Sequence, residues 1–404
     1  MATRVVTYRL RLRALLLWLV LGAFVGALCG VASASFLWLL ELASGLRAAH
    51  HELVLALPLA GLLLGWVYER LGPSIQAGSS LIIDTIVDDG PEIPLRMAPL
   101  VLLGTVLTHL FGGSAGREGT AVQVGASLTD FFAQRARLSS TLRRQLLVAG
   151  VAGGFGSVFG TPLAGAVFGL ELVVLGRIEY GALVPALAAS LVGDAVTRSL
   201  GIEHTAYPLV HAVPLSPLLL LKWLVFAAAV ALVATAFMEL VHWLKRHGQR
   251  LRLPFRMAAG GLLVVVLWQV VGRDDYLGLG VPGILRSFSD PSLPHAAFAL
   301  KVLFTAVTLA AGFLGGEVTP LFFIGAALGN LLGRALGIPL DLAAGVGMAA
   351  MFGAAANTPL ALSLMALELL GPSVMPHVLV VSAVAYWMTG QRSIYAAQLR
   401  RPKP

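Results

Sequence analysis

The stretch GGSAGREGTAVQVGASL, Gly112–Leu128, has a counterpart 200 positions later, GFLGGEVTPLFFIGAAL, Gly312–Leu328. At this constant offset Gly116 aligns with Gly316, and the segments end in the related strings VGASL and IGAAL. Two copies of one pattern within an apolar chain indicate an internal duplication.

A second pair of segments follows the first in the same order. TPLAGAVFGLEL, Thr161–Leu172, is similar to TPLALSLMALEL, Thr358–Leu369. Glycine and proline interrupt the apolar runs at matching places in the two halves. This arrangement is typical of membrane transporters built from two inverted repeats, with the substrate site at the repeat interface.

The composition places the chain in the membrane. Its 404 residues are 58% hydrophobic and 12% charged, and the mean hydropathy is +0.86. A soluble domain carries about 25% charged residues, so too little polar surface is present to cover a soluble core. Ala14–Leu40 and Leu215–Leu240 reach the roughly 20 residues that span a bilayer.

We therefore predict an all-α, multi-pass integral membrane protein with many short and broken helices. It forms a single transmembrane domain over residues 1–404, with repeat halves at about 14–200 and 216–395. The halves join near Gly201–Leu215, and no soluble regulatory domain is expected. The first apolar run is too long for a cleaved signal peptide, so we expect an uncleaved first helix.

The net charge of +8 comes from basic residues in short segments between apolar runs. This is the positive-inside pattern, which predicts both termini on the cytoplasmic side of the membrane and argues against nucleic-acid binding. The clustered residues are Arg4, Arg9, Arg11 and Arg13; Arg135, Arg137, Arg143 and Arg144; Lys245, Arg246, Arg250, Arg252 and Arg256; and Arg400, Arg401 and Lys403. The single cysteine, Cys29, excludes an internal disulfide.

Several apolar segments are too short to cross a bilayer and are bounded by glycine or proline. They imply helices that end inside the membrane. These segments are Ser79–Val87, Thr120–Phe132, Pro162–Leu175, Pro320–Leu332 and Pro359–Leu370. The first N–H groups of a helix have no intrahelical partner and carry partial positive charge. Converging helix starts therefore predict an anion site, the alternative being ordinary caps of packed helices.

Glu118 is the most specific candidate for a functional residue. It lies between Arg117 and Gly119 at a helix start in apolar surroundings, and ionisable groups at membrane depth are costly and usually functional. Its carboxylate can occupy the position of an anion at the helix ends, and on protonation it no longer competes. Glu118 can thus be both gate and proton carrier; the alternative is a capping carboxylate paired with Arg117.

Other acidic residues are assigned less specific roles. Glu317 aligns with Arg117 and not with Glu118, whose partner is Val318, so we expect one proton-handling site and not two. Glu171 and Glu368 are repeat-related, which favours a structural role over a place in a proton path.

At these residues the chain resembles the CLC family of chloride channels and proton-coupled anion antiporters. Gly116–Thr120 is similar to the family's GREGP motif, Gly316–Pro320 to GxFxP, and Gly78–Ile82 to GSGIP. Tyr395 stands at the position of the inner-gate tyrosine. The resemblance implies a homodimer with one anion pathway per subunit and the gating role for Glu118. We expect no cofactor and no metal.

Departures from these motifs resemble the fluoride/proton antiporters of the family, with which bacteria expel fluoride. GREGP ends in Thr120, and the third motif reads GGEVTP. Leu172 replaces the internal glutamate of proton-coupled chloride members. We therefore expect fluoride export in exchange for protons; a chloride/proton antiporter or a passive chloride channel remains the alternative. The expected anion site comprises amides around Ser79, Ser80, Gly119, Glu317 and Val318, with Thr319 lining it and Tyr395 at the inner opening.

A remote alternative is an intramembrane hydrolase, because Gly112–Gly116 matches G-x-S-x-G and His109 is near Ser114. A nucleophile elbow needs a strand before the serine, and none is predicted here. We therefore expect no enzyme. Glu239 and His242 share a helix face beside basic residues and indicate a helix end at the membrane edge, not a metal site.

Overall fold

The computed structural model describes residues 2–88, 90–173, 178–390, 392–395 and 397–398. Within these ranges the regular structure is helical, apart from one isolated bridge between Gly116 and Gly316. The last basic cluster, residues 400–403, and the side chains of residues 2–11 lie outside the described part of the chain.

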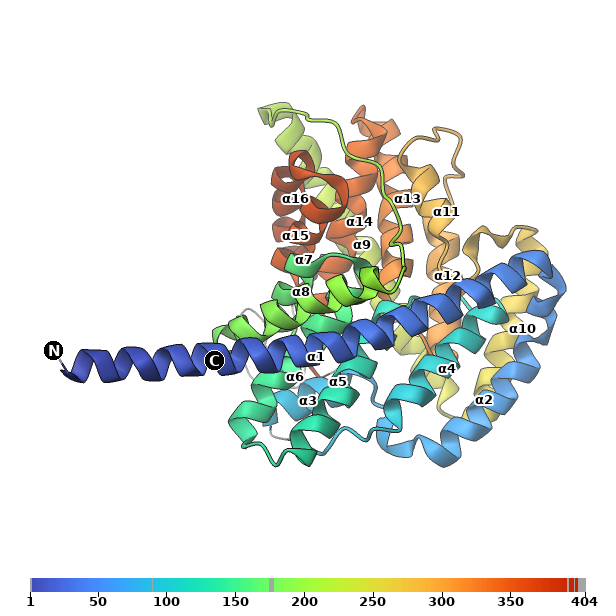
Figure 1. Ribbon diagram of the computed structural model, residues 1–404. Coiled ribbons are helices and arrows are strands. Elements are labelled where there is room, and N and C mark those ends of the chain that lie inside the picture. Colours follow the sequence, from blue (N-terminus) through green and yellow to red (C-terminus); the bar gives the residue numbers. More distant parts are fainter. Residues whose placement is uncertain (1, 89, 174–177, 391, 396, 399–404) are drawn as a thin grey trace.

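Sixteen α-helices occur in the described residues, in two series of eight (Figure 1). The first series is α1 (Ala2–Ala49), α2 (Leu57–Leu71), α3 (Ser79–Asp88), α4 (Met97–Leu110), α5 (Glu118–Arg135), α6 (Ser140–Phe159), α7 (Pro162–Glu171) and α8 (Leu183–Ser199). The second is α9 (Pro217–Gly248), α10 (Leu253–Val271), α11 (Val281–Ser287), α12 (Ala297–Ala311), α13 (Val318–Leu336), α14 (Leu340–Ala356), α15 (Pro359–Leu370) and α16 (Met375–Thr389). The predicted all-α, two-repeat membrane fold is confirmed.

The two series meet at Gly116 and Gly316. The Gly116 N–H donates to the Gly316 carbonyl at 2.6 Å, and the Gly316 N–H donates to the Gly116 carbonyl at 2.8 Å. The same position of each half thus pairs with the other in an antiparallel, reciprocal way. Such pairing is expected where two halves are related by an approximate two-fold axis that passes between these two glycines.

A second reciprocal contact joins α7 to α15. Glu171 accepts hydrogen bonds from the N–H groups of Leu360 and Ala361 at 3.2 and 2.8 Å. The repeat-related Glu368 accepts from the first-turn N–H groups at positions 163 and 164, at 2.9 and 2.8 Å. Each carboxylate therefore satisfies the orphan N–H groups at the start of the other short helix, in line with the structural role expected for Glu171 and Glu368.

The short helices agree with the prediction only in part. α7 and α15 have 10 and 12 residues, but α5 and α13 have 18 and 19, and α13 is long and apolar enough to span a membrane. The prediction was wrong about these lengths because the helices continue past the predicted ends, through Gln134–Arg135 in α5 and through Gly333–Arg334 in α13. Both still begin inside the protein, at Glu118 and Val318, which are buried.

Six helical stretches of the described residues are long and apolar enough to cross a membrane. They are Leu12–Ala49, His51–Leu71, Tyr180–Ser199, Pro217–Gly248, Leu253–Val271 and Val318–Leu336. The first contains the predicted span Ala14–Leu40, and the fourth covers the predicted span Leu215–Leu240 except for its first two residues. The chain is therefore a multi-pass membrane protein.

The halves are joined by a non-helical segment, residues 202–216, between α8 and α9. Figure 1 shows it as a long connection running along the body of the molecule. Its Val210 N–H donates to the Leu370 carbonyl at 3.0 Å, and the His204 ring contacts the Ser157 carbonyl at 2.9 Å. The predicted join at 201–215 thus lies against the helices of both halves.

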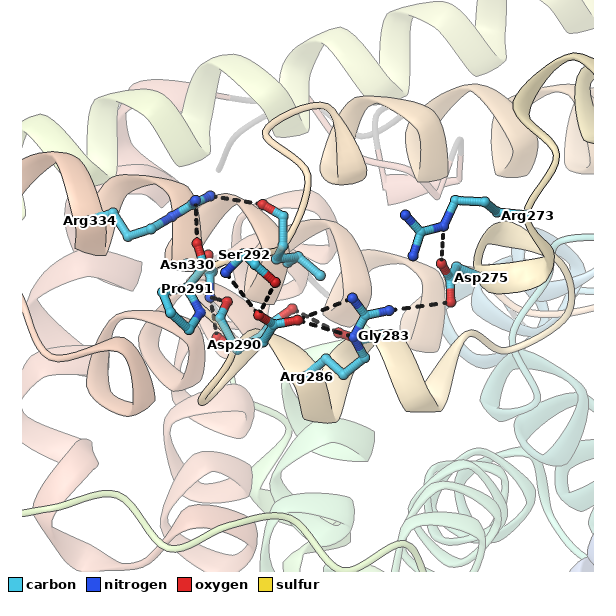
Figure 2. A network of polar contacts seen from close by, with 11 residues as sticks. Arg273, Asp275, Gly283, Arg286, Asp290, Pro291, Ser292, Asn330 and Arg334 are labelled. Atoms are coloured by element: carbon cyan, nitrogen blue, oxygen red, sulfur yellow. Dashed lines mark hydrogen bonds and ion pairs between the residues drawn. The ribbon is translucent and has the colours of Figure 1, made fainter.

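A polar network holds the loop that follows α11 (Figure 2). The Asn330 amide donates to the carbonyls of Ser287 and Asp290 at 2.8 and 3.0 Å, and Arg334 donates to the Pro291 carbonyl at 2.7 Å. In the first half the equivalent of Asn330 is Asp130, which accepts from the Ile93 N–H at 2.7 Å. Both repeats therefore fix this loop from the same helical position, with opposite hydrogen-bonding roles.

Candidate anion-binding site

Glu118 lies at the first position of α5, beside the two-fold bridge, with no exposed surface. Glycine at 116 makes room for it, since a Cβ there would lie 2.8 Å from Glu118 Oε2 and 2.9 Å from the Gly316 carbonyl. The close approach of the two halves thus positions the carboxylate at the centre of the molecule.

The Glu118 carboxylate reaches across the repeat interface to the start of α13. Its Oε2 accepts from the Thr319 N–H at 3.2 Å, and its Oε1 accepts from the Thr319 hydroxyl. Pro320 follows in the first helical turn, so that position offers no N–H. A carboxylate oxygen therefore lies at the positive end of α13, where the backbone N–H groups favour negative charge.

Neighbouring groups complete the surroundings of the carboxylate. The Arg117 N–H donates to Glu118 Oε2 at 3.1 Å, and Arg117 Nε lies 3.5 Å from Oε1. The Arg117 guanidinium also lies 3.5 Å from the Thr205 hydroxyl in the segment that joins the halves. The carboxylate thus contacts both the start of α13 and Arg117, the partners named in the two sequence-based interpretations.

A cavity of about 870 Å³ opens on one side of this centre. Four of the predicted site residues line it: Ser79, Ser80, Glu317 and Tyr395. Glu118 is not part of the lining, whereas Glu317, at the N-cap of α13, is. A Cβ at Gly119 would lie 3.6 Å from Glu317 Oε2. The Glu317 carboxylate therefore lies next to the first turn of α5.

The serines at the start of α3 are partly committed to other contacts. The Ser80 N–H donates to the Ala77 carbonyl at 3.0 Å, which contradicts the expectation that this amide is free for an anion. The reason is that the chain enters α3 through a tight turn at Gly78, whose φ is +54°. The Ser79 hydroxyl accepts from the Gln123 amide at 3.4 Å, so hydroxyl groups face this region.

The other predicted residues lie around the bridge. Gly119 and Val318 occupy the first turns of α5 and α13 and are buried. Tyr395 is 6% exposed and lies at the edge of the cavity. The structure thus gathers Glu118, Gly119, Val318 and Thr319 in one buried group, and places the remaining predicted residues along the cavity.

Sequence analysis missed the polar lining of the cavity. Gln76, Gln123 and Gln249 contribute amides, and Lys245, Arg246 and Arg256 contribute cations. These cations had been interpreted only as a sign of membrane orientation. Their clustering at the end of α9 and the start of α10 is visible in the sequence. No local sequence pattern, however, shows that α9 lies near α5.

The contacts of Ser114 do not support a hydrolase. Its hydroxyl pairs with the Thr305 hydroxyl at 2.9 Å. The His109 ring nitrogens face the carbonyls of Thr105 and Ala115, at 2.8 and 3.0 Å. In the described residues no strand precedes Ser114, so the requirements of a nucleophile elbow are not met.

Comparisons with known proteins agree with this architecture. The family model described as voltage gated chloride channel matches residues 60–390. The chain is 44% identical over 394 residues to a protein of Pseudomonas syringae pv. tomato named "Chloride/fluoride channel protein", covering 94% of this chain and 86% of that one. It is 28% identical to a protein of Salmonella typhi named "Voltage-gated ClC-type chloride channel ClcB", with 81% and 80% covered.

Solved structures show the same fold. A crystal structure of a CLC-type fluoride/proton antiporter superimposes with a TM-score of 0.91 at 35% identity, covering 96% of this chain and 98% of that one. A cyanobacterial Cl⁻/H⁺ antiporter superimposes with a TM-score of 0.81 at 20% identity, covering 95% and 97%. With the repeat interface, the buried glutamate and the family match taken together, the chain belongs to the voltage gated chloride channel family, the CLC family.

Proposed function

We propose that this protein is a fluoride/proton antiporter that exports fluoride. The observation that carries the proposal is the Glu118 carboxylate bound by the N–H and hydroxyl of Thr319. The similar relative named "Chloride/fluoride channel protein" and the similar fluoride/proton antiporter structure support fluoride as the anion. Neither the family description nor these names is that of an enzyme, which supports transport as the activity.

In the proposed cycle, Glu118 and fluoride compete for the start of α13. The ionised carboxylate occupies the Thr319 N–H and hydroxyl and blocks the pathway. Protonation removes the negative charge from Glu118 and weakens its hold on the positive helix end. Fluoride then takes the Thr319 donors, and the displaced Glu118 carries its proton to the other side.

Glu317 supplies a route for that proton. Glu118 is fully buried, so it needs a titratable partner through which to exchange protons with the cavity. Glu317 is the carboxylate nearest in sequence to Thr319, and it lines the cavity together with Tyr395. We therefore extend the single proton-handling residue expected from the sequence to two carboxylates in series, Glu118 and Glu317.

The chloride alternatives differ from this proposal in the anion or in the coupling. A chloride/proton antiporter would use the same gate, and a passive chloride channel would conduct without proton movement. Because a Cl⁻/H⁺ antiporter has the same fold, the chloride/proton alternative is tested directly in the experiment below. The protein is proposed to work as a homodimer in a bacterial inner membrane, with both termini in the cytoplasm.

The test is anion efflux from proteoliposomes, followed with fluoride and chloride electrodes while external pH is recorded. The proposal expects fluoride efflux accompanied by proton uptake, and slower chloride efflux. Chloride efflux as fast as fluoride efflux would overturn the selectivity, and fluoride efflux without proton movement would overturn antiport.

A further inference from the structure

The cavity is asymmetric with respect to the two-fold axis. In the first half, the residues that line the cavity include Gly78 in the turn before α3, Val101 on α4 and Gln123 on α5. Inverted repeats place an equivalent position on the opposite face of the membrane. At the offset of 200 residues, the counterparts are Gly278, Lys301 and Phe323.

The backbone turns of the two halves are alike. Gly78 has a φ of +54° and Gly278 a φ of +53°, and each precedes the third helix of its half, α3 or α11. The two turns lie at opposite faces. The cavity is lined by Leu253 at the start of α10, whereas the second turn follows the end of α10, about 28 Å along a helix of this length.

The turn at Gly78 borders the open cavity, whereas side chains fill the space beside the turn at Gly278. Lys301 on α12 is fully buried, and its ammonium donates to the carbonyls of Tyr276 and Gly278 at 3.1 and 2.8 Å. The Phe323 ring of α13 lies beside it, with the ammonium 5.4 Å from the ring centroid. A Cβ at Gly280 would lie 2.8 Å from this ring and 3.1 Å from Lys301 Nζ.

Lys301 is an unusual residue for this place. In the described part of the chain it takes part in no ion pair with a carboxylate, and a buried ammonium is costly unless its protons are accepted. A valine, as at the equivalent position 101, would fill helix-packing space without that cost. The role of the Lys301 ammonium is therefore to hold the turn whose carbonyls, those of Tyr276 and Gly278, accept its hydrogen bonds.

We propose that Lys301 closes the repeat counterpart of the anion cavity, and so makes the cavity open at one face only. Its ammonium joins the turn at Tyr276 and Gly278 to α12, and the turn packs against Phe323 on the helix whose first turn holds Glu118. Lys301 is thus a positioning residue. This inference rests on the proposed function in treating the open cavity as the anion's access route.

Thiol accessibility tests the closure without any assumption about the transported anion. Leu277 is 1% exposed, and its repeat counterpart Ala77 is an exposed residue of the cavity lining. Leu277→Cys and Ala77→Cys are each combined with Lys301 or with Lys301→Met in the full chain. The purified proteins are treated with a charged methanethiosulfonate reagent. Native Cys29, also 1% exposed, reports global opening.

With Lys301 present, the thiol introduced at position 77 is expected to react quickly and the thiol at position 277 slowly. Lys301→Met removes two hydrogen bonds from a charged donor and should speed the reaction at position 277 at least about tenfold. The rate at position 77 should stay unchanged, and Cys29 should stay unreacted. An unchanged slow rate at position 277 would overturn the proposal. Reaction of Cys29 together with the thiol at position 277 would also overturn it, because Lys301 would then hold the whole fold and not this turn.

A rescue experiment separates closure by the ammonium from simple packing. In Lys301→Ala, methylammonium should slow the reaction of the thiol at position 277 again because it can donate to the two carbonyls. Tetramethylammonium at the same concentration has no N–H group and should leave the reaction fast. Equal effects of the two ions would contradict a role for the hydrogen-bonded ammonium. Fluoride selectivity plays no part in either result, so failure of the proposed function would be seen separately.

Discussion

Glu118 and Thr319 lie 201 positions apart in the sequence and meet at the interface of the two repeats, where the Thr319 N–H donates to the Glu118 carboxylate at 3.2 Å. The hydroxyl of the same threonine donates to the other carboxylate oxygen. One half thus supplies the titratable group and the other half supplies its donors. The backbone is symmetric at Gly116 and Gly316. The side chains are not, because Glu118 in the first half aligns with Val318 in the second.

Thr319→Val should weaken fluoride binding. The substitution keeps the branched shape of the side chain and removes the hydroxyl, so one hydrogen bond to an anion is lost. Such bonds are worth about 1.5–3 kcal/mol, which predicts a rise in the fluoride KM of roughly ten- to a hundredfold. Fluoride efflux at a series of internal concentrations measures it. Thr319→Ser retains the hydroxyl and should stay within a few-fold of the unaltered protein; equal KM values for Val and Ser would contradict the role of the hydroxyl.

Glu171→Gln should lower stability with little effect on proton coupling. Glutamine keeps one acceptor oxygen at the start of α15 but loses the charge that favours a helix N-terminus, a change of about 0.3–2 kcal/mol. Thermal unfolding in detergent should show a lower Tm. Glu368→Gln removes the repeat-equivalent contact with α7 and should behave alike. A loss of proton coupling at unchanged Tm would instead place Glu171 in the proton path.

Gly116→Ala should abolish transport. The added Cβ would lie 2.8 Å from Glu118 Oε2 and 2.9 Å from the Gly316 carbonyl, closer than non-bonded atoms approach. Overpacking of this kind costs about 1–3 kcal/mol and displaces the gate. Fluoride efflux measures the effect. Gly45→Ala is a matched control, since no atom lies within 4 Å of a Cβ there; full transport by Gly116→Ala would contradict the tight interface.

Lys245→Gln should slow the capture of fluoride from the cavity side. Lys245 lines the cavity and contributes to its positive potential, which raises the local anion concentration. We expect a higher fluoride KM from that side with kcat little changed. The difference should shrink at high salt, because charges are screened beyond about 8 Å at an ionic strength near 0.15 M. A KM change that is independent of salt would indicate direct contact in place of attraction through the potential.

The fold and part of the candidate site could be predicted from repeated motifs and composition. The duplication predicted the two-repeat membrane fold, and the motifs at Gly116–Thr120 and Gly316–Pro320 predicted the family; both are confirmed. Glu118 was identified because an ionisable residue at a glycine-rich helix start is unusual in an apolar chain. Glu171 and Glu368 were assigned a structural role from their symmetry alone, and each caps the other's helix in the structure.

The rest depends on contacts that no local pattern contains. The cavity is lined by residues of α2, α3, α4, α5, α9, α10 and α12 and by the N-cap residue of α13. Gln123 and Lys245, on α5 and α9, therefore had no visible relation in the sequence. Glu317 was expected to contribute its amide to the anion site but not to handle protons, because it aligns with Arg117; in the structure it lines the cavity. The lengths of α5 and α13 were underestimated because polar residues near their ends, such as Arg135, were taken as helix ends.

The most direct test of the account is Glu118→Gln in proteoliposomes loaded with fluoride, with fluoride efflux and external pH recorded in one sample. Glutamine keeps the size of the side chain and cannot be ionised, so it neither blocks the helix end as an anion nor carries a proton. The account predicts that proton movement stops and that any fluoride flux is uncoupled from pH. Proton uptake in unchanged ratio to fluoride efflux would contradict the assignment of Glu118 as gate and proton carrier.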